Sequence, residues 1–248
     1  MTGLDAVLAD IVTLSGPALT NIYFAVASIP AGFGLGILLA LGKASANPLV
    51  SRLCRGYIYF FRGSPFFIQL FAFYSLALAF NLSLWKPLGI DGFVLHPLFL
   101  GPAILTLNTA AYDAEIFHGA MRAVPHGELE AARAFGMSPA QRFRSIIWPH
   151  MIRIAWPGYT NELVLLFQAT ALIYFTLPVV GDQKDLMNKA GEMFERDYNV
   201  FLHFGVAALY FFAVSLLIFA LCGLIYRRLM RHLPHQTLRF SFRRIGDL

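Results

Sequence analysis

Three acidic side chains, Asp113, Glu115 and Glu162, lie inside long apolar stretches of this sequence. A charge at the centre of a membrane helix costs about 2.5–3.5 kcal/mol on insertion scales, so each acid needs a physical reason. Such acids can bind a cationic group, relay protons, or join helices through hydrogen bonds. None of the three has an evident Lys or Arg partner within the chain.

Other polar residues recur near these acids at helical spacing. Asn108, Tyr112 and Glu115 follow an i, i+4, i+7 pattern, which puts them on one face of a helix. Asn161 and Gln168 share a face of a later apolar stretch by the same spacing. Such a face could line a polar pathway, or it could be a seam of hydrogen bonds between helices. No nucleophile, base and metal-ligand set converges here, so a membrane-embedded enzyme is not indicated.

Composition places these residues in a membrane protein. The chain has 248 residues, of which 58% are hydrophobic and only 13% charged. A soluble domain carries roughly 25% charged residues. The two cysteines have no motif spacing, and the histidines show no metal-ligand spacing, so neither a disulfide nor a metal site is indicated. We therefore predict an all-α integral membrane protein.

Five stretches supply the roughly 20 apolar residues that a membrane-spanning helix needs. They comprise residues 16–41, 57–84, 96–118, 154–180 and 201–226. Gly32, Gly34 and Gly36 in the first stretch would let a neighbouring helix approach closely.

The positive charges orient these spans. Most of the 19 Lys and Arg residues fall after the first, third and fifth stretches. Cytoplasmic loops carry an excess of Lys and Arg, so the N-terminus is expected outside and the C-terminus inside. This divides the chain into a short external segment (1–15), a membrane domain (16–226) and a basic cytoplasmic tail (227–248).

Residues 122–150 form a polar stretch that this orientation places in the cytoplasm. Helix formers run up to Gly136, which is a natural helix end. Ser138 and Gln141 then make a capping box that starts a second short helix, which Pro149 should end. The resulting hairpin could rest on the membrane, or it could dock a soluble partner.

Two further segments flank the spans. Residues 47–62 set arginines beside aromatic residues and could lie along the inner membrane interface. Residues 181–199, between the last two spans, are polar and acidic. They are either a solvated outer loop or an outer docking surface.

The hairpin resembles the EAA loop of ABC importer permeases. The resemblance is carried by Glu130-Ala131-Ala132, by Gly136, and by Ile146 and Pro149 at the spacing of that pattern. Trp148 stands where the pattern has Leu, which is a mild departure because both residues are apolar.

Three further motifs are similar to those of the polar amino-acid uptake permeases within that group. They are Arg62-Gly63-Ser64-Pro65 followed by Gln69, Leu107-Asn108-Thr109-Ala110-Ala111-Tyr112 followed by Glu115-Ile116, and Asn161-Glu162 followed by Thr170-Ala171-Leu172. Four motifs in the right order cover nearly the whole chain. One departure is Gln168, where the family often has Lys, and it leaves the local charge more negative.

The resemblance implies the type I ABC importer permease fold in a bacterial inner membrane, and a set of partners. Two cytoplasmic ATPases would dock on the EAA loop, a second permease subunit would complete a homo- or heterodimer, and an external solute-binding protein would deliver the substrate. The sequence has no Gly-x-x-x-x-Gly-Lys-Ser/Thr phosphate loop, so ATP and Mg are expected on the partner ATPase, with no cofactor on this chain and no nucleic-acid partner. The residues expected to dock the ATPase are Glu130, Ala131, Ala132, Gly136, Ser138, Ile146 and Pro149.

The resemblance also implies a polar amino acid as substrate. The surplus of acids favours a basic amino acid or an opine-like derivative, since an opposite charge compensates for desolvation. The expected pathway residues are Asn108, Tyr112, Asp113, Glu115, Asn161, Glu162 and Gln168. The alternative is a proton-coupled secondary transporter, against which the absence of inverted repeats argues.

Overall fold

The computed structural model describes residues 3–179 and 183–231, and every element within them is helical. Residues 1–2 and most of the predicted basic tail, residues 232–248, lie outside the described residues. Arg239, Arg243 and Arg244, which contribute to the charge argument for orientation, are among them. The prediction of an all-helical protein is confirmed for the described part of the chain.

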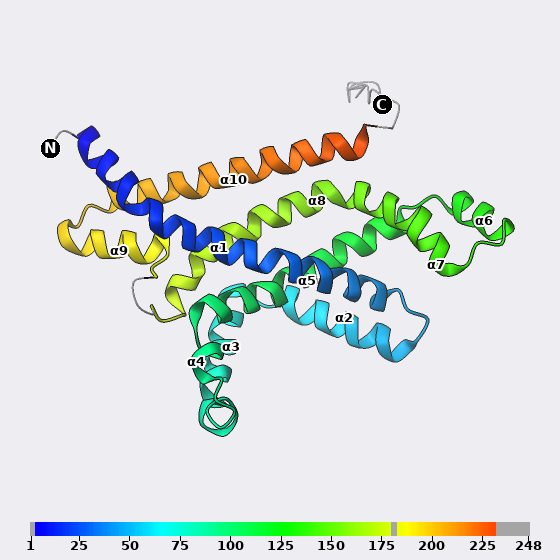
Figure 1. Ribbon diagram of the computed structural model, residues 1–248, viewed down its shortest axis with the longest axis horizontal. Coiled ribbons are helices and arrows are strands. Elements are labelled where there is room, and N and C mark those ends of the chain that lie inside the picture. Colours follow the sequence, from blue (N-terminus) through cyan, green and yellow to red (C-terminus); the bar gives the residue numbers. More distant parts are fainter. Residues whose placement is uncertain (1–2, 180–182, 232–248) are drawn as a thin grey trace, which may run out of the picture.

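Four long helices run side by side and make up the body of the molecule (Figure 1). They are α1 (Gly3–Lys43), α5 (Pro97–Arg122), α8 (Trp148–Ala169) and α10 (Val200–Met230). α1 and α10 are long and apolar enough to cross a membrane. α1 begins at Gly3, so residues 3–15, predicted to precede the first span, continue the same helix.

Two glycines bring α1 against α5. A Cβ added to Gly32 would lie 2.5 Å from Thr109 Cγ2, and one added to Gly36 would lie 2.6 Å from Asp113 Cβ. The space beside Gly34 is open, because it lies between them on another face of the helix. Small residues therefore permit the close approach that the sequence predicts, but through two of the three glycines.

The second predicted span, residues 57–84, is broken. α2 (Pro48–Gly63) ends at Ser64, and α3 (Phe66–Ala79) begins after Pro65 and leads into the π-helical turn η1 (Asn81–Trp85). Proline excludes the preceding residue from the helical region, and Ser64 is extended at φ −120° and ψ 144°. The prediction of one continuous span was wrong, because Pro65 interrupts the helix at Ser64.

α2 lies alongside α1 and α5 (Figure 1). The Tyr57 hydroxyl donates a hydrogen bond to the Leu107 carbonyl in the middle of α5 (2.7 Å). Near the start of α2, Cys54 packs so closely against Gly42 that an added Cβ would lie 2.4 Å from its sulfur. One face of α2 therefore packs against the long helices, whereas Leu49, Leu53, Tyr59 and Phe60 on its other faces are exposed.

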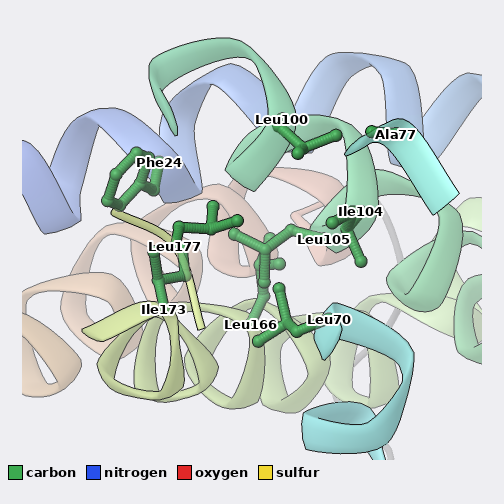
Figure 2. Packing of buried hydrophobic residues seen from close by; sticks show 9 residues of the cluster. All are labelled: Phe24, Leu70, Ala77, Leu100, Ile104, Leu105, Leu166, Ile173 and Leu177. Atoms are coloured by element: carbon green, nitrogen blue, oxygen red, sulfur yellow. The ribbon is translucent and has the colours of Figure 1, made fainter. Parts of the chain in front are cut away.

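A buried apolar cluster joins α3 to the long helices (Figure 2). It consists of Phe24, Leu70, Ala77, Leu100, Ile104, Leu105, Leu166, Ile173 and Leu177. These side chains come from α1, α3, α5, α8 and the region of the 3-10 helix η3 (Thr170–Phe175). The short helix α4 (Asp91–Val94) connects η1 to α5.

The end of the molecule opposite the hairpin is closed by α9 (Leu186–Asp197) (Figure 1). The Asn21 side chain on α1 donates to Thr170 Oγ1 (3.0 Å) and accepts from the Leu186 amide (2.8 Å). His203, near the start of α10, has its ring nitrogens 2.6 Å from Asp10 Oδ2 and 2.8 Å from Asp197 Oδ1. Side-chain hydrogen bonds thus fix α9 against α1 and α10.

Candidate functional site

A polar hollow of about 160 Å³ opens where α3, α5 and α8 meet. Three predicted pathway residues, Asn108, Tyr112 and Glu162, line it together with Thr109. The remaining wall is apolar: Phe66, Leu105, Leu165, Leu166 and Ala169. Two residues of the predicted α5 face, Asn108 and Tyr112, therefore meet Glu162 of α8, which does not belong to the predicted face of Asn161 and Gln168.

Glu162 is the one carboxylate in this lining. Its side chain is buried, and Thr109 Oγ1 donates a hydrogen bond to its Oε1 (3.0 Å). Burying a carboxylate is costly unless it is paired, and a single hydroxyl leaves most of its hydrogen-bonding capacity unused. Thr109 was not predicted as a site residue, and its place in the 107–112 motif was its only signal.

Gln69 fixes Asn108 at the edge of the hollow. Asn108 Nδ2 donates to Gln69 Oε1 (2.8 Å), and Gln69 Nε2 donates to the Phe61 (2.7 Å) and Ser64 (2.9 Å) carbonyls. Gln69 is buried and so satisfies the carbonyls that the break between α2 and α3 leaves open. It shapes the site by positioning that break.

Asp113 does not line the hollow, although its charge acts on that of Glu162. It is 1% exposed and packs against Gly36 of α1. Its Oδ1 atom has no hydrogen-bond partner among the described residues. The arrangement suits a contact between helices better than a contact with a solute.

Glu115 opens onto a second hollow, of about 490 Å³, beside the first. This hollow is lined by Lys43, Arg55, Ile58, Tyr59, Arg62, Gly63 and Glu115. Lys43, at the end of α1, forms an ion pair with Glu115. The expectation that the three acids lack cationic partners in this chain was therefore wrong for Glu115, because α1 continues far enough to bring Lys43 beside α5.

Arg62 marks the border between the two hollows. Its guanidinium carbon is 5.3 Å from the centroid of the Tyr112 ring, within the distance of a cation–π contact. Arg62 lines the larger hollow and Tyr112 the smaller one. Arg62 was quoted only as a motif residue and was not predicted to belong to the site.

Asn161 and Gln168 do not line either hollow. Both are exposed on the outer face of α8, together with Leu165, which borders the smaller hollow. They do share a face, as their spacing predicts. Within the described residues, no group of three or more His, Cys, Asp or Glu side chains could hold a metal ion.

The hairpin predicted from residues 122–150 begins with α6 (His126–Ala134). Gly136 has φ +73°, and the Gly136 and Met137 amides donate to the Arg133 (2.9 Å) and Ala132 (3.0 Å) carbonyls. This pair of bonds is a Schellman motif, which needs a left-handed residue and so favours glycine. The predicted helix end at Gly136 is confirmed.

The second helix of the hairpin, α7 (Pro139–Arg142), starts with the predicted capping box. Ser138 Oγ accepts from the Gln141 amide (3.3 Å), and Gln141 Oε1 accepts from the Ser138 amide (2.8 Å). The helix does not end at Pro149 as predicted, because the π-helical turn η2 (Phe143–Ile147) leads directly into α8. Pro149 is in the first turn of α8, where its missing amide hydrogen is tolerated.

The tip of the hairpin presents a mixed polar and apolar surface. Glu130, Ala131, Gly136 and Ser138 are exposed, whereas Ala132 is buried and Ile146 and Pro149 are half-buried. Phe135 is 86% exposed, beside Gly136. Phe135 is not among the residues predicted to dock the ATPase, and its exposure has no signal in the sequence.

Comparison with known proteins identifies the family. Residues 32–238 match the family model described as binding-protein-dependent transport system inner membrane component. The histidine/lysine/arginine/ornithine transport system permease protein HisM of Salmonella typhimurium is 36% identical over 219 residues, which cover 88% of this chain and 90% of that protein. The nopaline transport system permease protein NocM of Agrobacterium fabrum is 38% identical over 153 residues, which cover 62% of this chain and 63% of that protein.

Solved structures agree with the assignment. A chain from the crystal structure of an amino acid ABC transporter with histidines has a TM-score of 0.73 at 26% identity, covering 92% of this chain and 99% of that one. A chain of the MetNI methionine ABC transporter has a TM-score of 0.65 at 19% identity, with 92% and 99% coverage, and supports the fold alone. The chain therefore has the type I ABC importer permease fold and belongs to the family of binding-protein-dependent transport system inner membrane components.

Proposed function

We propose that this chain is the permease subunit of an ATP-driven importer for a basic amino acid or an amino-acid derivative such as an opine. The proposed substrate class rests on the Glu162 carboxylate. This carboxylate is buried, lines the smaller hollow, and has unused hydrogen-bonding capacity. An opposite charge compensates a buried carboxylate, so a cationic group is the ligand that this site favours. The names of HisM and NocM, which refer to basic amino acids and nopaline, support the same class.

The substrate pathway runs past Glu162, Asn108 and Tyr112 in this proposal. Asn161 and Gln168 support its position, because exposed amides on a membrane helix need partners that lipid does not provide. A second permease subunit, identical or related, would cover this face of α8 and enclose the pathway. Asp113 and Glu115 then act in helix contacts, through Gly36 and Lys43.

The cytoplasmic hairpin docks one of two partner ATPases. Its two capped ends fix its shape, and exposed Phe135, Glu130 and Ala131 supply apolar and charged contacts. Aromatic side chains that fill a pocket on a partner dominate the energetics of many interfaces. ATP and Mg would be bound by the ATPases, and this chain would transmit their motion.

Five membrane crossings fit the helices, with the hairpin inside and α9 outside in a bacterial inner membrane. α1, α5, α8 and α10 supply four crossings. α3 alone has 14 residues, but α3 and η1 together cover residues 66–85, which approach the roughly 20 that a crossing needs. The outer end around α9 would then meet the solute-binding protein.

Transport by alternating access follows from these parts. ATP binding draws the two ATPases together, the hairpins follow, and the long helices open toward the loaded binding protein. Hydrolysis returns the inward-facing state. The site formed by the two hollows is exposed first to the outside and then to the cytoplasm. The substrate is not chemically changed.

Uptake by the complete complex in liposomes tests the substrate class. We expect labelled arginine, lysine or histidine to be taken up, and competition by basic amino acids to exceed competition by leucine or glutamate. Equal competition by an acidic amino acid would contradict the role given to Glu162. Energy from a proton gradient in place of ATP would favour a secondary transporter.

A further inference from the structure

Arg62 occupies a position that helix packing does not explain. Tyr57 binds the Leu107 carbonyl and Gln69 binds Asn108, so the end of α2 lies beside the middle of α5. Arg62 is exposed there, and no carboxylate lies within 4.0 Å of it in the part of the chain that the structure describes. Its charge acts on Glu162 without direct contact, and a guanidinium inside a membrane protein is stabilised when an anionic partner contacts it.

The two hollows that meet at Arg62 carry opposite charge. The larger one is lined by three cationic side chains and one carboxylate, and that carboxylate, Glu115, is already paired with Lys43. The smaller one contains only the Glu162 carboxylate. Tyr112, under the Arg62 guanidinium, lies between them. The geometry suits a ligand that carries both charges.

We propose that Arg62 binds the α-carboxylate of the transported amino acid while Glu162 receives its cationic end. This inference rests on the proposed function and adds the anion-binding half of the site. A guanidinium presents a planar fork of donors that matches a carboxylate with two parallel hydrogen bonds. Contact with the Tyr112 ring holds the guanidinium in place, which lowers the entropy lost on binding.

Arg55 provides a matched control for this role. It lies seven residues before Arg62 on the same exposed face of α2 and lines the same hollow. It has no contact with Tyr112 among those found for the described residues, and it does not border the smaller hollow. Removing the charge of Arg55 changes the electrostatic potential in the larger hollow but does not alter the contact between Arg62 and the Tyr112 ring.

The test compares each amino acid with its decarboxylated counterpart. The wild-type complex is first assayed for ATP-driven uptake of arginine, lysine and histidine. Equilibrium binding of the amino acid taken up, and of agmatine, cadaverine or histamine respectively, is then measured on the permease–ATPase complex in nanodiscs. Arg62→Gln should weaken binding of the amino acid about tenfold or more, the size of a lost charge-assisted contact. Binding of the amine should not weaken, because the positive charge of Arg62 acts on Glu162 and opposes a cation there. Arg55→Gln should change the dissociation constants of the amino acid and of the amine by less than about twofold each.

Several outcomes overturn the inference. Unchanged binding of the amino acid to Arg62→Gln would do so, as would equal loss of amino acid and amine. If Arg62→Gln fails to assemble, Arg62→Lys keeps the charge and must retain a preference for the amino acid over the amine. A wild-type complex that takes up none of the amino acids would instead overturn the proposed function itself.

Discussion

At the scale of single residues, the smaller hollow depends on the Glu162 carboxylate and its neighbour Thr109. Replacing Glu162 by Gln keeps the shape and the Thr109 contact but removes the negative charge. We expect uptake of a basic amino acid to fall about tenfold, which corresponds to about 1.4 kcal/mol of lost interaction. Initial rates of uptake by the reconstituted complex measure this effect.

Asp113→Asn is the control for this prediction. Asp113 packs against Gly36 and lies outside the hollow, so its neutral variant should keep more than half of the uptake at similar expression. If Asp113→Asn lost uptake and Glu162→Gln did not, the assignment of the two acids would have to be exchanged.

Glu192 gives a pH-dependent prediction at the outer end. The hydrogen bond from Lys184 and the nearby charge of Lys189 lower the pKa of this carboxyl. A lowered pKa in the folded state means that the pair stabilises α9 above the unfolded carboxyl pKa, about 4.3, and that this stabilisation is lost as the pH falls through the lowered value. Hydrogen exchange of α9, corrected for intrinsic rates, should show this loss of protection on acidification.

The Glu192→Gln variant should be less protected at neutral pH and should lose less protection on acidification. Glu195→Gln, on the exposed face of the same helix, should behave as wild type. If acidification lowered the hydrogen-exchange protection of α9 equally in wild type and Glu192→Gln, the ion pairs of Glu192 would not be the cause of the loss.

The residues of the site could be predicted only in part. The spacing of Asn108 and Tyr112 placed them on one face, and the structure puts both at the same hollow. The position of Arg62 at the border of that hollow could not be predicted, because the break at Pro65 sets the course of the chain there and was not predicted. Contacts between distant helices, such as Lys43 with Glu115, have no periodic signal in a single sequence.

At the scale of elements, the contact between α1 and α5 depends on Gly36. In Gly36→Ala the added Cβ would meet Asp113 Cβ and approach backbone atoms of α5 at 3.4 Å, so the helices must move apart. Overpacking of this kind costs about 1–3 kcal/mol. A thermal unfolding scan in detergent should show a lower melting temperature.

Gly34→Ala, two residues away, is the matched variant. It meets nothing within 4 Å and gains helix propensity of about 1 kcal/mol, so its melting temperature should not fall. A decrease in both variants would show that the glycines matter for helix flexibility rather than for packing.

The hairpin gives a second prediction at this scale. Gly136→Leu places a side chain at φ +73°, where a Cβ is strained by about 1–2 kcal/mol, and this distorts the turn. We expect loss of ATPase co-purification and of uptake, with membrane insertion unchanged. Gly127→Ala, in open space on α6, should retain both. Full uptake by Gly136→Leu would contradict docking at the hairpin.

Local capping signals made the hairpin predictable. Gly136, Ser138 and Gln141 act through bonds to residues a few positions away, so the sequence contains the whole interaction. The end of the second helix was predicted wrongly at Pro149. A proline in the first turn of a helix is compatible with it, and the π-helical turn before it lets the chain continue into α8.

At the scale of the whole molecule, the single chain has an exposed polar face that a complex would cover. Asn161, Gln168 and Arg62 are all exposed, although the elements that carry them pack beside α5. The all-helical class and the family could be predicted from composition and motif order, and both are confirmed.

Uptake in the absence of a proton gradient distinguishes an ATP-driven importer from a proton-coupled secondary transporter. Proteoliposomes containing the permease and its ATPase are supplied with loaded binding protein outside and ATP inside, with an uncoupler to abolish any proton gradient. We predict that the labelled amino acid accumulates inside, and that accumulation stops without ATP or in Gly136→Leu. Accumulation by permease-only liposomes in response to an imposed proton gradient, without ATP or ATPase, would contradict the account.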